Sequence, residues 1–217
     1  VGAYTLNNKY TITASYRYDG ASLSWVPEKN RWHGFYSFGA TWDAKQEQFL
    51  SDVSLISALR LRASYGQTAS PFGSIFAYYP TYSVTGTYNG QGTIRPSNLG
   101  NPDFDWEYVD EFNAGFDLSL FASQRIKVVF DWYNKVTKGM FIEQDVSATA
   151  GGGVGTAVML STGSMRNRGI ELSLSGDIIK EKNFNWNVGI NGAFNENRIL
   201  RVADLTDQMP DGDTRVI

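Results

Sequence analysis

Residues 10–19 read YTITASYRYD, a stretch that alternates strictly between two kinds of side chain. Every even position is apolar or aromatic, and every odd position is polar. Successive side chains of a β-strand point to opposite faces of the sheet, so a period of two indicates a strand between two different environments. The stretch predicts a strand with one apolar and one polar face.

The same alternation recurs along the chain. Six further segments show it: 35–43, 57–66, 109–120, 126–135, 169–176 and 184–195. The nearest approach to a helical stripe is a single possible turn within 49–58. We therefore predict an all-β chain with seven antiparallel strands.

The predicted connections alternate between short and long. Short ones occupy 121–125 and 177–183, and about fourteen residues join the second and third strands. The others span 20–34, 67–108, 136–168 and 198–217. Strands that run up and down in sequence order place all the long connections at the same end of the sheet.

This combination predicts an antiparallel transmembrane β-barrel, in which strands alternate apolar-out and polar-in between short turns and long loops. Aromatic residues near the predicted strand ends fit interfacial girdles: Tyr18, Trp42, Tyr65, Trp132 and Trp186. A soluble β-sandwich has the same alternation and stays open as an alternative. The strongly polar second face and the long loops favour the barrel.

Composition excludes several kinds of function. The chain has no cysteine, which removes disulfides, thiolate metal sites and a thiol nucleophile. A single histidine, His33, argues against a histidine-rich metal site, and a net charge of −3 argues against nucleic acid as a partner. No apolar run is long enough for a transmembrane helix. We expect no cofactor, no resident metal and no enzymatic activity.

Seven strands cannot close a bacterial outer-membrane barrel, whose strand number is even and at least eight. We therefore expect residues 1–217 to be one part of a barrel domain. The chain opens without a recognisable leader sequence, and it stops within a predicted loop.

Three segments resemble the SusC/RagA family of TonB-linked outer-membrane proteins. They are YRYDGAS at 16–22 followed by RWHGFYSFGATW at 31–42, LRLRASYGQT at 59–68 followed by NPDFDWE at 101–107, and MRNRGIEL at 165–172. The Asn-Pro-x-x-x-Trp-Glu and Arg-Asn-Arg-Gly-Ile-Glu elements are the more specific ones, and the segments occur in the family's order.

The resemblance implies a barrel of about 22 strands in the bacterial outer membrane, with an N-terminal plug domain that this sequence lacks together with the closing strands. It also implies import of oligosaccharides or peptides, a SusD-like surface lipoprotein as a lid, and energy from a TonB complex contacted through the missing N-terminal region. Outer-membrane lipid would surround the barrel.

Two groups of residues are candidates for substrate binding. The first lies in the predicted 67–108 loop, whose aromatic rings could stack on sugars or peptide side chains: Phe76, Tyr78, Tyr79, Tyr82 and Tyr88. Packing against neighbouring loops or the lid is the alternative. The second group is Arg60 and Arg62 on one polar strand face, which could attract an anionic group or pair with Glu111 and Asp117.

Other polar clusters are less specific. We expect Arg166 and Arg168 to hydrogen-bond loop carbonyls, with Gly169 allowing close approach. The glycine run at 151–155 lacks the following Lys-Ser/Thr of a phosphate-binding loop. An acidic segment near the end fits a solvated loop better than a calcium site: Asp204, Asp207, Asp211 and Asp213.

Three functions remain open from the sequence: a SusC-like importer, a siderophore-type receptor barrel without a lid, and a soluble carbohydrate-binding sandwich. A detergent requirement separates the barrels from the sandwich, and a co-purifying lipoprotein separates the two barrels.

Overall fold

A computed structural model describes residues 1–21, 27–70, 78–146 and 157–202 of the chain. Most of these residues form strands, whose bounds are β1 (Gly2–Leu6), β2 (Tyr10–Gly20), β3 (Trp32–Asp43), β4 (Ile56–Ser70), β5 (Thr81–Tyr88), β6 (Gln91–Asn98), β7 (Glu107–Leu120), β8 (Ile126–Asp145), β9 (Ala157–Lys180) and β10 (Asn185–Arg201). The short helical turns are η1 (Glu28–Asn30), η2 (Ala44–Gln46) and α1 (Gln48–Ser51). None of the helices in the described ranges is long and apolar enough to cross a membrane.

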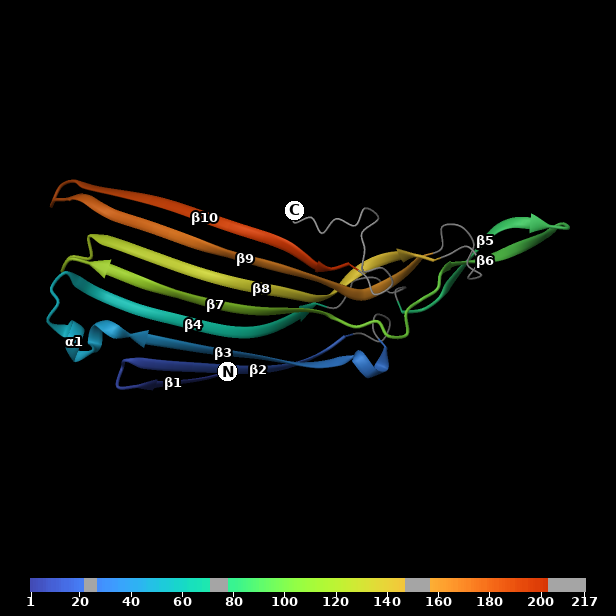
Figure 1. Ribbon diagram of the computed structural model, residues 1–217, viewed down its shortest axis with the longest axis horizontal. Helices are drawn as coiled ribbons and strands as arrows, with labels where there is room; N and C mark the ends of the chain where they lie inside the picture. The colour runs from blue at the N-terminus through green and yellow to red at the C-terminus, as the bar shows by residue number, and fades with distance from the viewer. Residues whose placement is uncertain (22–26, 71–77, 147–156, 203–217) are drawn as a thin grey trace.

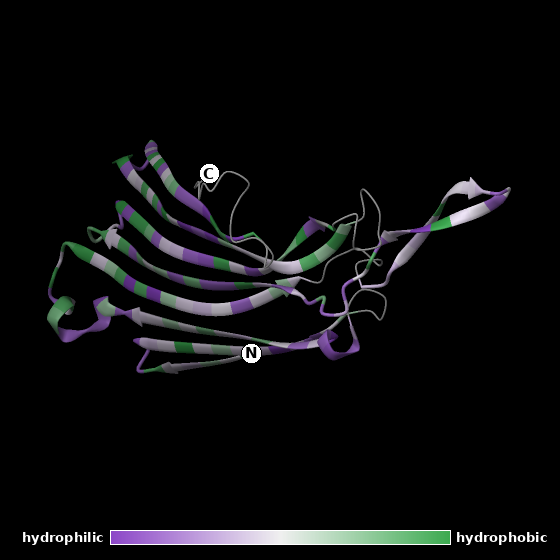
Figure 2. Ribbon diagram, turned by 45° about the vertical axis from the view of Figure 1, so that its right-hand side comes forward, coloured by the Kyte–Doolittle hydropathy of each residue, from purple (hydrophilic) through white to green (hydrophobic). Residues whose placement is uncertain are grey.

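The strands form one curved antiparallel sheet in the order β1-β2-β3-β4-β7-β8-β9-β10 (Figure 1). Each strand pairs with the next one in the chain, apart from the hairpin of β5 and β6 between β4 and β7. The seven strands predicted from the alternation are confirmed as β2, β3, β4, β7, β8, β9 and β10. Hydropathy alternates along these strands (Figure 2).

The structure adds three strands to the predicted seven. β1 has only five residues, too few to show a clear period of two. The β5–β6 hairpin lies in the segment predicted as a loop over 67–108, and its turn is Asn89-Gly90, with φ of 51° and 76°. Two consecutive left-handed residues of this type make a tight hairpin turn. The loop prediction is wrong here, because Asn89-Gly90 closes a hairpin inside this segment.

The predicted 136–168 loop is also mostly strand. β8 continues to Asp145 and β9 begins at Ala157, so that the two strands pair well beyond the sheet's other strands. The strand extends past a bulge at Gly139, whose φ is 71°. A Cβ at this position would lie 2.7 Å from the carbonyl oxygen of Trp106. Glycine is therefore required where β8 passes close to the backbone that leads into β7. The glycine run at 151–155 lies outside the described residues.

The two ends of the sheet differ, as predicted. One end, here called the turn end, carries the connections 7–9, 44–55, 121–125 and 181–184. The other, the loop end, carries the longer connections and the β5–β6 hairpin, which projects beyond the sheet (Figure 1). Among the described residues, the hairpin pairs with the sheet at one position, where Asn98 is opposite Ala157.

Very little of the described chain is buried. Its nearly inaccessible apolar side chains are Phe35, Ala44, Phe104 and Trp106. Large apolar side chains on the strands stay exposed, as Ile12, Ile190 and Phe194 do at 59%, 65% and 64%. A soluble domain of this length buries most of its apolar surface in a core. The single sheet therefore needs an external apolar environment, which contradicts the β-sandwich alternative.

Candidate functional site

The apolar side chains of neighbouring strands meet in rows across one face of the sheet, here called the apolar face. One row of paired residues crosses seven strands without interruption and is named the central row: Ile12, Ala40, Ala63, Ala114, Trp132, Ile170 and Phe194. Because side chains alternate, a slip of one residue at any pairing would turn a strand's apolar set to the opposite face. The apolar patterns of all seven strands thus fix the same register.

The apolar band on this face shifts along the strands from one side of the sheet to the other. On β2 it continues beyond Ile12 to Tyr18, six residues nearer the loop end. On β9 and β10 it stops at the central row, because the next residues on that face are Arg168 and Glu196. The border therefore moves by six residues, or ~20 Å at ~3.4 Å per residue.

This shift measures the tilt of the strands. β2 and β10 are six strand-to-strand steps apart, or ~29 Å at ~4.8 Å per step. A displacement of ~20 Å over that width corresponds to a tilt of about 35°, which is within the range of strands in transmembrane barrels. A flat hydrocarbon layer produces such an oblique band on a tilted sheet. The apolar face therefore has the geometry of a surface against a bilayer.

The opposite face, here called the polar face, carries the candidate pair Arg60 and Arg62. Arg60 Nε donates to Asp43 Oδ1 at 2.7 Å. Arg62 donates from one nitrogen to Asp117 Oδ1 at 3.1 Å and Asp131 Oδ2 at 3.2 Å. The predicted pairing with Asp117 is confirmed.

The other predicted carboxylate, Glu111, pairs instead with Lys135 at 3.2 Å. Arg62 lies across from Gly115, whose missing side chain leaves room for the guanidinium to reach β8. These ion pairs join β3, β4, β7 and β8 through side chains, and they neutralise much of the charge that an anionic ligand would meet.

The candidate tyrosines are divided between the hairpin and its base. Tyr82 and Tyr88 lie on β5 and are 64% and 80% exposed. Tyr78 and Tyr79 precede the hairpin, with ring centroids 4.5 Å apart. Phe76 lies outside the described residues. The two β5 tyrosines share their hairpin with Val84 and Ile94, 73% and 71% exposed, so the hairpin presents an apolar and aromatic surface beyond the sheet.

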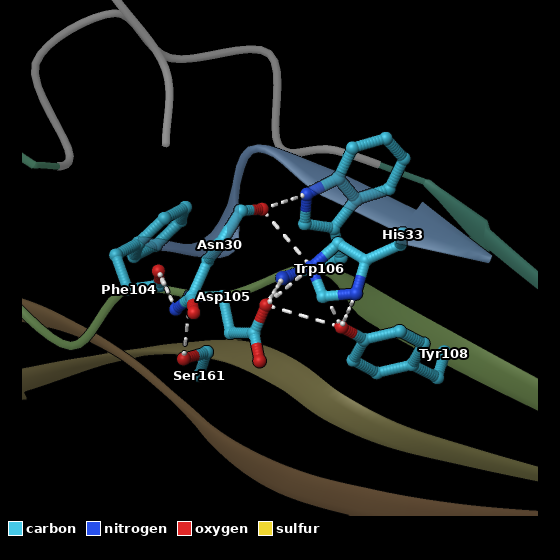
Figure 3. Close-up of polar contacts among 7 residues, drawn as sticks. All are labelled: Asn30, His33, Phe104, Asp105, Trp106, Tyr108 and Ser161. Carbon is cyan, nitrogen blue, oxygen red and sulfur yellow. Dashed lines mark hydrogen bonds and ion pairs between the residues drawn. The ribbon is translucent and has the colours of Figure 1, made fainter. Parts of the chain in front are cut away.

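A hydrogen-bonded cluster at the loop end holds four separate segments together (Figure 3). Trp106 Nε1 donates to the carbonyl of Asn30 at 2.7 Å, and Asn30 Nδ2 donates to the carbonyl of Phe104 at 2.9 Å. The backbone N–H of Asp105 donates to Ser161 Oγ at 3.3 Å, which reaches β9. We call these residues, with His33 and Tyr108, the loop-end cluster.

His33 belongs to this cluster and does not face an open cleft. Its Nε2 lies 2.9 Å from the carbonyl oxygen of Asn30, and its ring nitrogens lie 2.9 and 3.1 Å from the Tyr108 hydroxyl. The Tyr108 hydroxyl also donates to Asp105 Oδ1 at 3.1 Å. All of these contacts join strands and loops. The arrangement is that of a structural cross-link between η1, β3 and β7.

The Asn-Pro-x-x-x-Trp-Glu motif at 101–107 has a structural role that its sequence alone does not indicate. Asn101 Oδ1 accepts the N–H of Asp103, and its Nδ2 donates to the carbonyl of Met159 at 3.0 Å. Phe104 stacks on Phe141 of β8. The motif therefore folds the chain before β7 across β8 and β9.

For the Arg-Asn-Arg-Gly-Ile-Glu motif at 166–171, the prediction that its arginines bind loop carbonyls is wrong. Arg166 and Arg168 lie within β9, and Arg168 binds the Glu196 carboxylate at 2.7 and 2.9 Å, not loop carbonyls. A Cβ on Gly169 would clash with the carbonyl oxygen of Phe194 and the ring of Tyr133, so the predicted close approach is confirmed.

Within the described ranges, no three His, Asp or Glu side chains gather in a way that could hold a metal ion. The acidic residues Asp204, Asp207, Asp211 and Asp213 lie outside those ranges.

Comparison with known proteins shows that the chain is similar to TonB-dependent receptors. The family of "TonB dependent receptor-like, beta-barrel" proteins matches residues 2–215. TonB-dependent receptor P39 of Formosa agariphila is 34% identical over 205 residues, covering 93% of this chain and 19% of that protein. TonB-dependent receptor SusC of Bacteroides thetaiotaomicron is 32% identical over 212 residues, covering 94% of this chain and 20% of that protein.

Solved structures agree with the sequence relatives. The RagAB peptide transporter is similar with a TM-score of 0.81 at 27% identity, over 96% of this chain and 23% of the matched chain. Its open-open state gives a TM-score of 0.82 at the same identity. The chain thus spans about a fifth of the length of the curated relatives it matches.

Proposed function

This chain belongs to the family of TonB-dependent receptor-like β-barrels of the bacterial outer membrane, and we propose that it is a wall segment of a SusC-like nutrient importer. The observation that carries this proposal is the match to the RagAB transporter over 96% of the chain. The oblique apolar band and the polar opposite face support it, because a transport barrel needs lipid on one side and water on the other.

We propose that the whole protein imports oligosaccharides or peptides. The similarity to RagAB, a peptide transporter, supports the peptide class, and the similarity to SusC supports the importer type. The family consists of receptors and not enzymes. A siderophore-type receptor is the less favoured function, because the similar proteins include SusC and RagAB.

The partners follow from the same relatives. We propose that TonB supplies the energy, which the family's name supports, and that a SusD-like surface lipoprotein covers the loop end. We also propose that residues 1–217 contribute to a barrel of about 22 strands, the size at which outer-membrane transporters enclose a plug domain. The remainder of the barrel and the plug would then belong to other parts of the whole protein.

Within this chain, we propose that Tyr78, Tyr79, Tyr82 and Tyr88 contact the substrate or the lid. The exposure of Tyr82 and Tyr88 supports this role, because an exposed aromatic hairpin has no packing function within the sheet. Arg60 and Arg62 are weaker candidates, since both guanidinium groups are held by carboxylates of the same sheet. A substrate anion would have to compete with these pairs.

The test is uptake by cells that carry or lack the full-length gene. Labelled oligosaccharides and labelled oligopeptides are supplied separately, in a strain with TonB and in one without it. We expect deletion of the gene, and equally loss of TonB, to abolish uptake of one class. A lipoprotein should co-purify with the full-length protein in mild detergent. Unchanged uptake of both classes, together with lost uptake of iron chelates, would overturn the proposal.

A further inference from the structure

Two arginines face each other on the apolar face, just beyond the apolar band. Arg166 of β9 and Arg198 of β10 are directly paired in the sheet. The register from Met165 to Asp177 shows no bulge, so Arg166 is on the same face as Ile170. On β10, Arg198 is likewise on the face of Phe194.

Nearby charges are already matched with one another. Arg168 is bound by Glu196, and Lys138 Nζ donates to Asp110 Oδ2 at 2.8 Å. Arg166 and Arg198 make no ion pair or side-chain hydrogen bond with any described residue. The residue of β8 paired with Arg166 is the uncharged Val136.

Like charges directly opposite each other destabilise an antiparallel pair. No described carboxylate forms an ion pair with either arginine, because the nearest one on this face, Glu196, is bound by Arg168. A bound anion between the two guanidinium groups would offset their repulsion, because each group offers a planar fork of donors that matches a phosphate.

The position of the pair defines which anion can reach it. Arg166 lies four residues beyond Ile170 towards the loop end, which is ~14 Å along the strand. Because the strand is tilted, this corresponds to about 11 Å along the membrane normal, away from the membrane centre. The loop end of an outer-membrane barrel is the extracellular end. Arg166 and Arg198 therefore lie at the headgroup level of the outer leaflet, with long side chains that extend towards the polar layer.

The ion pair of Arg168 and Glu196 lies between the two arginines and the central row, and from the central row towards the membrane centre the surface is apolar and accessible. Trp132, Ile170 and Phe194 of the central row are 39%, 43% and 64% exposed. A ligand that contacts both the central row and the two arginines needs acyl chains against the row and a negative charge against the arginines. A lipid with a phosphate-bearing headgroup has both.

We propose that Arg166 and Arg198 form a binding site for the phosphate group of an outer-leaflet lipid. The site depends on the membrane location of the barrel and not on its transport activity. Failure of the lipid test therefore leaves the proposed import untouched, and failure of the uptake test leaves this site untouched.

The experiment uses the full-length protein, purified free of lipid in detergent. Purified bis-phosphorylated lipid A is added as the probe, and native mass spectrometry counts the lipid bound. The double variant Arg166→Gln/Arg198→Gln should bind the probe at least tenfold more weakly than the wild type. Lipid A stripped of its phosphates should bind the wild type as weakly as the phosphorylated probe binds the variant.

A matched control removes the same amount of charge elsewhere. Lys127→Gln/Lys182→Gln changes a residue of the polar face and one of the turn end, and it should bind lipid A like the wild type. If the double arginine variant does not fold, Arg198→Gln alone should weaken binding at least threefold. The proposal is overturned if the arginine variant binds within twofold of the wild type, or if dephosphorylated lipid A binds equally well.

Discussion

The indole Nε1 of Trp106 donates a hydrogen bond of 2.7 Å to the backbone carbonyl of Asn30, 76 residues away in the sequence. The same ring packs against Phe35 and is only 2% exposed. This contact attaches the β2–β3 connection to the start of β7, although β3 and β7 are separated by β4 in the sheet. It is part of the small buried region of the described chain, and it rigidifies the loop end.

Truncation of Trp106 should loosen the loop end. Trp106→Phe removes the hydrogen bond but keeps a ring, and we expect a loss of about 1 kcal/mol. Trp106→Ala also leaves a cavity and should cost about 3–5 kcal/mol. Thermal unfolding of the full-length protein in detergent measures both. Trp186→Phe, at a side chain that is 50% exposed, is the control and should be nearly neutral. Equal effects of the two phenylalanine variants would contradict this role.

Neighbouring residues on β4 should respond differently to a positive charge. Ala63 is in the central row, and Ser64 points to the polar face. Ala63→Lys places an ammonium in hydrocarbon and should cost about 2–4 kcal/mol. Ser64→Lys meets water and should cost less than about 1 kcal/mol. The comparison is made on the full-length barrel in lipid vesicles, by folding yield and by unfolding in denaturant. A larger loss for Ser64→Lys would mean that the faces are assigned the wrong way round.

The ion pairs of Arg62 should act as one unit. Arg62→Gln leaves Asp117 and Asp131 near each other without their cation, and we expect a loss of about 1 kcal/mol at this partly exposed site. Asp131→Asn in the same protein should recover part of that loss, so a double-mutant cycle gives a coupling energy. If Arg62 binds substrate instead, the variant would weaken uptake at low substrate concentration while stability stays unchanged.

The β5–β6 hairpin should be dispensable for folding and needed for function. In the part of the chain that the structure describes, it pairs with the sheet only through Asn98 and Ala157, so replacing residues 81–98 by a short Gly-Ser linker should leave the barrel's melting temperature within a few degrees. Uptake, or retention of the surface lipoprotein, should fall at least tenfold. The milder variant Tyr82→Ser/Tyr88→Ser should also lower uptake or retention of the lipoprotein, by a smaller factor. A hairpin variant with full uptake and full lipoprotein retention would remove these tyrosines from the candidate site.

At the turn end, Glu47 should make stability depend on pH. The Tyr10 hydroxyl donates to its carboxylate at 2.6 Å and Lys9 donates at 3.1 Å, and these bonds lower the pKa of Glu47 below its usual value of 4.5. The ionised form is thus favoured by folding. The contribution of the Glu47 carboxylate to folding stability is complete at pH values above its usual pKa. This contribution disappears as the pH falls through the lowered pKa of the folded protein.

The variant Glu47→Gln tests this relationship. Wild type should be more stable than the variant near neutral pH, and the two should converge in acid, as measured by melting temperature against pH. Glu181→Gln, in the β9–β10 turn, serves as the control for the removal of one surface carboxylate. A difference that is constant down to strongly acidic pH would exclude Glu47 as the titrating group.

The sequence by itself determined which residues of each long strand share a face. In 10–19 and in 126–135 the period of two is a local property of extended backbone, so it can be read without knowing any partner. It predicted all seven strands of the wall, their antiparallel order and the contrast between the two ends. The motifs that resemble a known family predicted a barrel of about 22 strands with a plug domain, of which this chain is one part.

The short elements were recoverable only in part. The Asn89-Gly90 turn is a local signal for a hairpin, so β5 and β6 are predictable from the sequence. The extension of β8 and β9 was not recoverable, because residues beyond the membrane lack the alternation that a bilayer imposes.

Only the tertiary structure decided which side chains meet. The alternation does not state which residue of β9 is opposite Arg198, or that Arg62 reaches Asp131, 69 residues away. Those pairs depend on the register between strands, which is set where the apolar residues of seven strands align in one row. A pattern within one strand specifies its faces, but a contact requires the relative position of two strands, and that is fixed by the turns and by the shared apolar row.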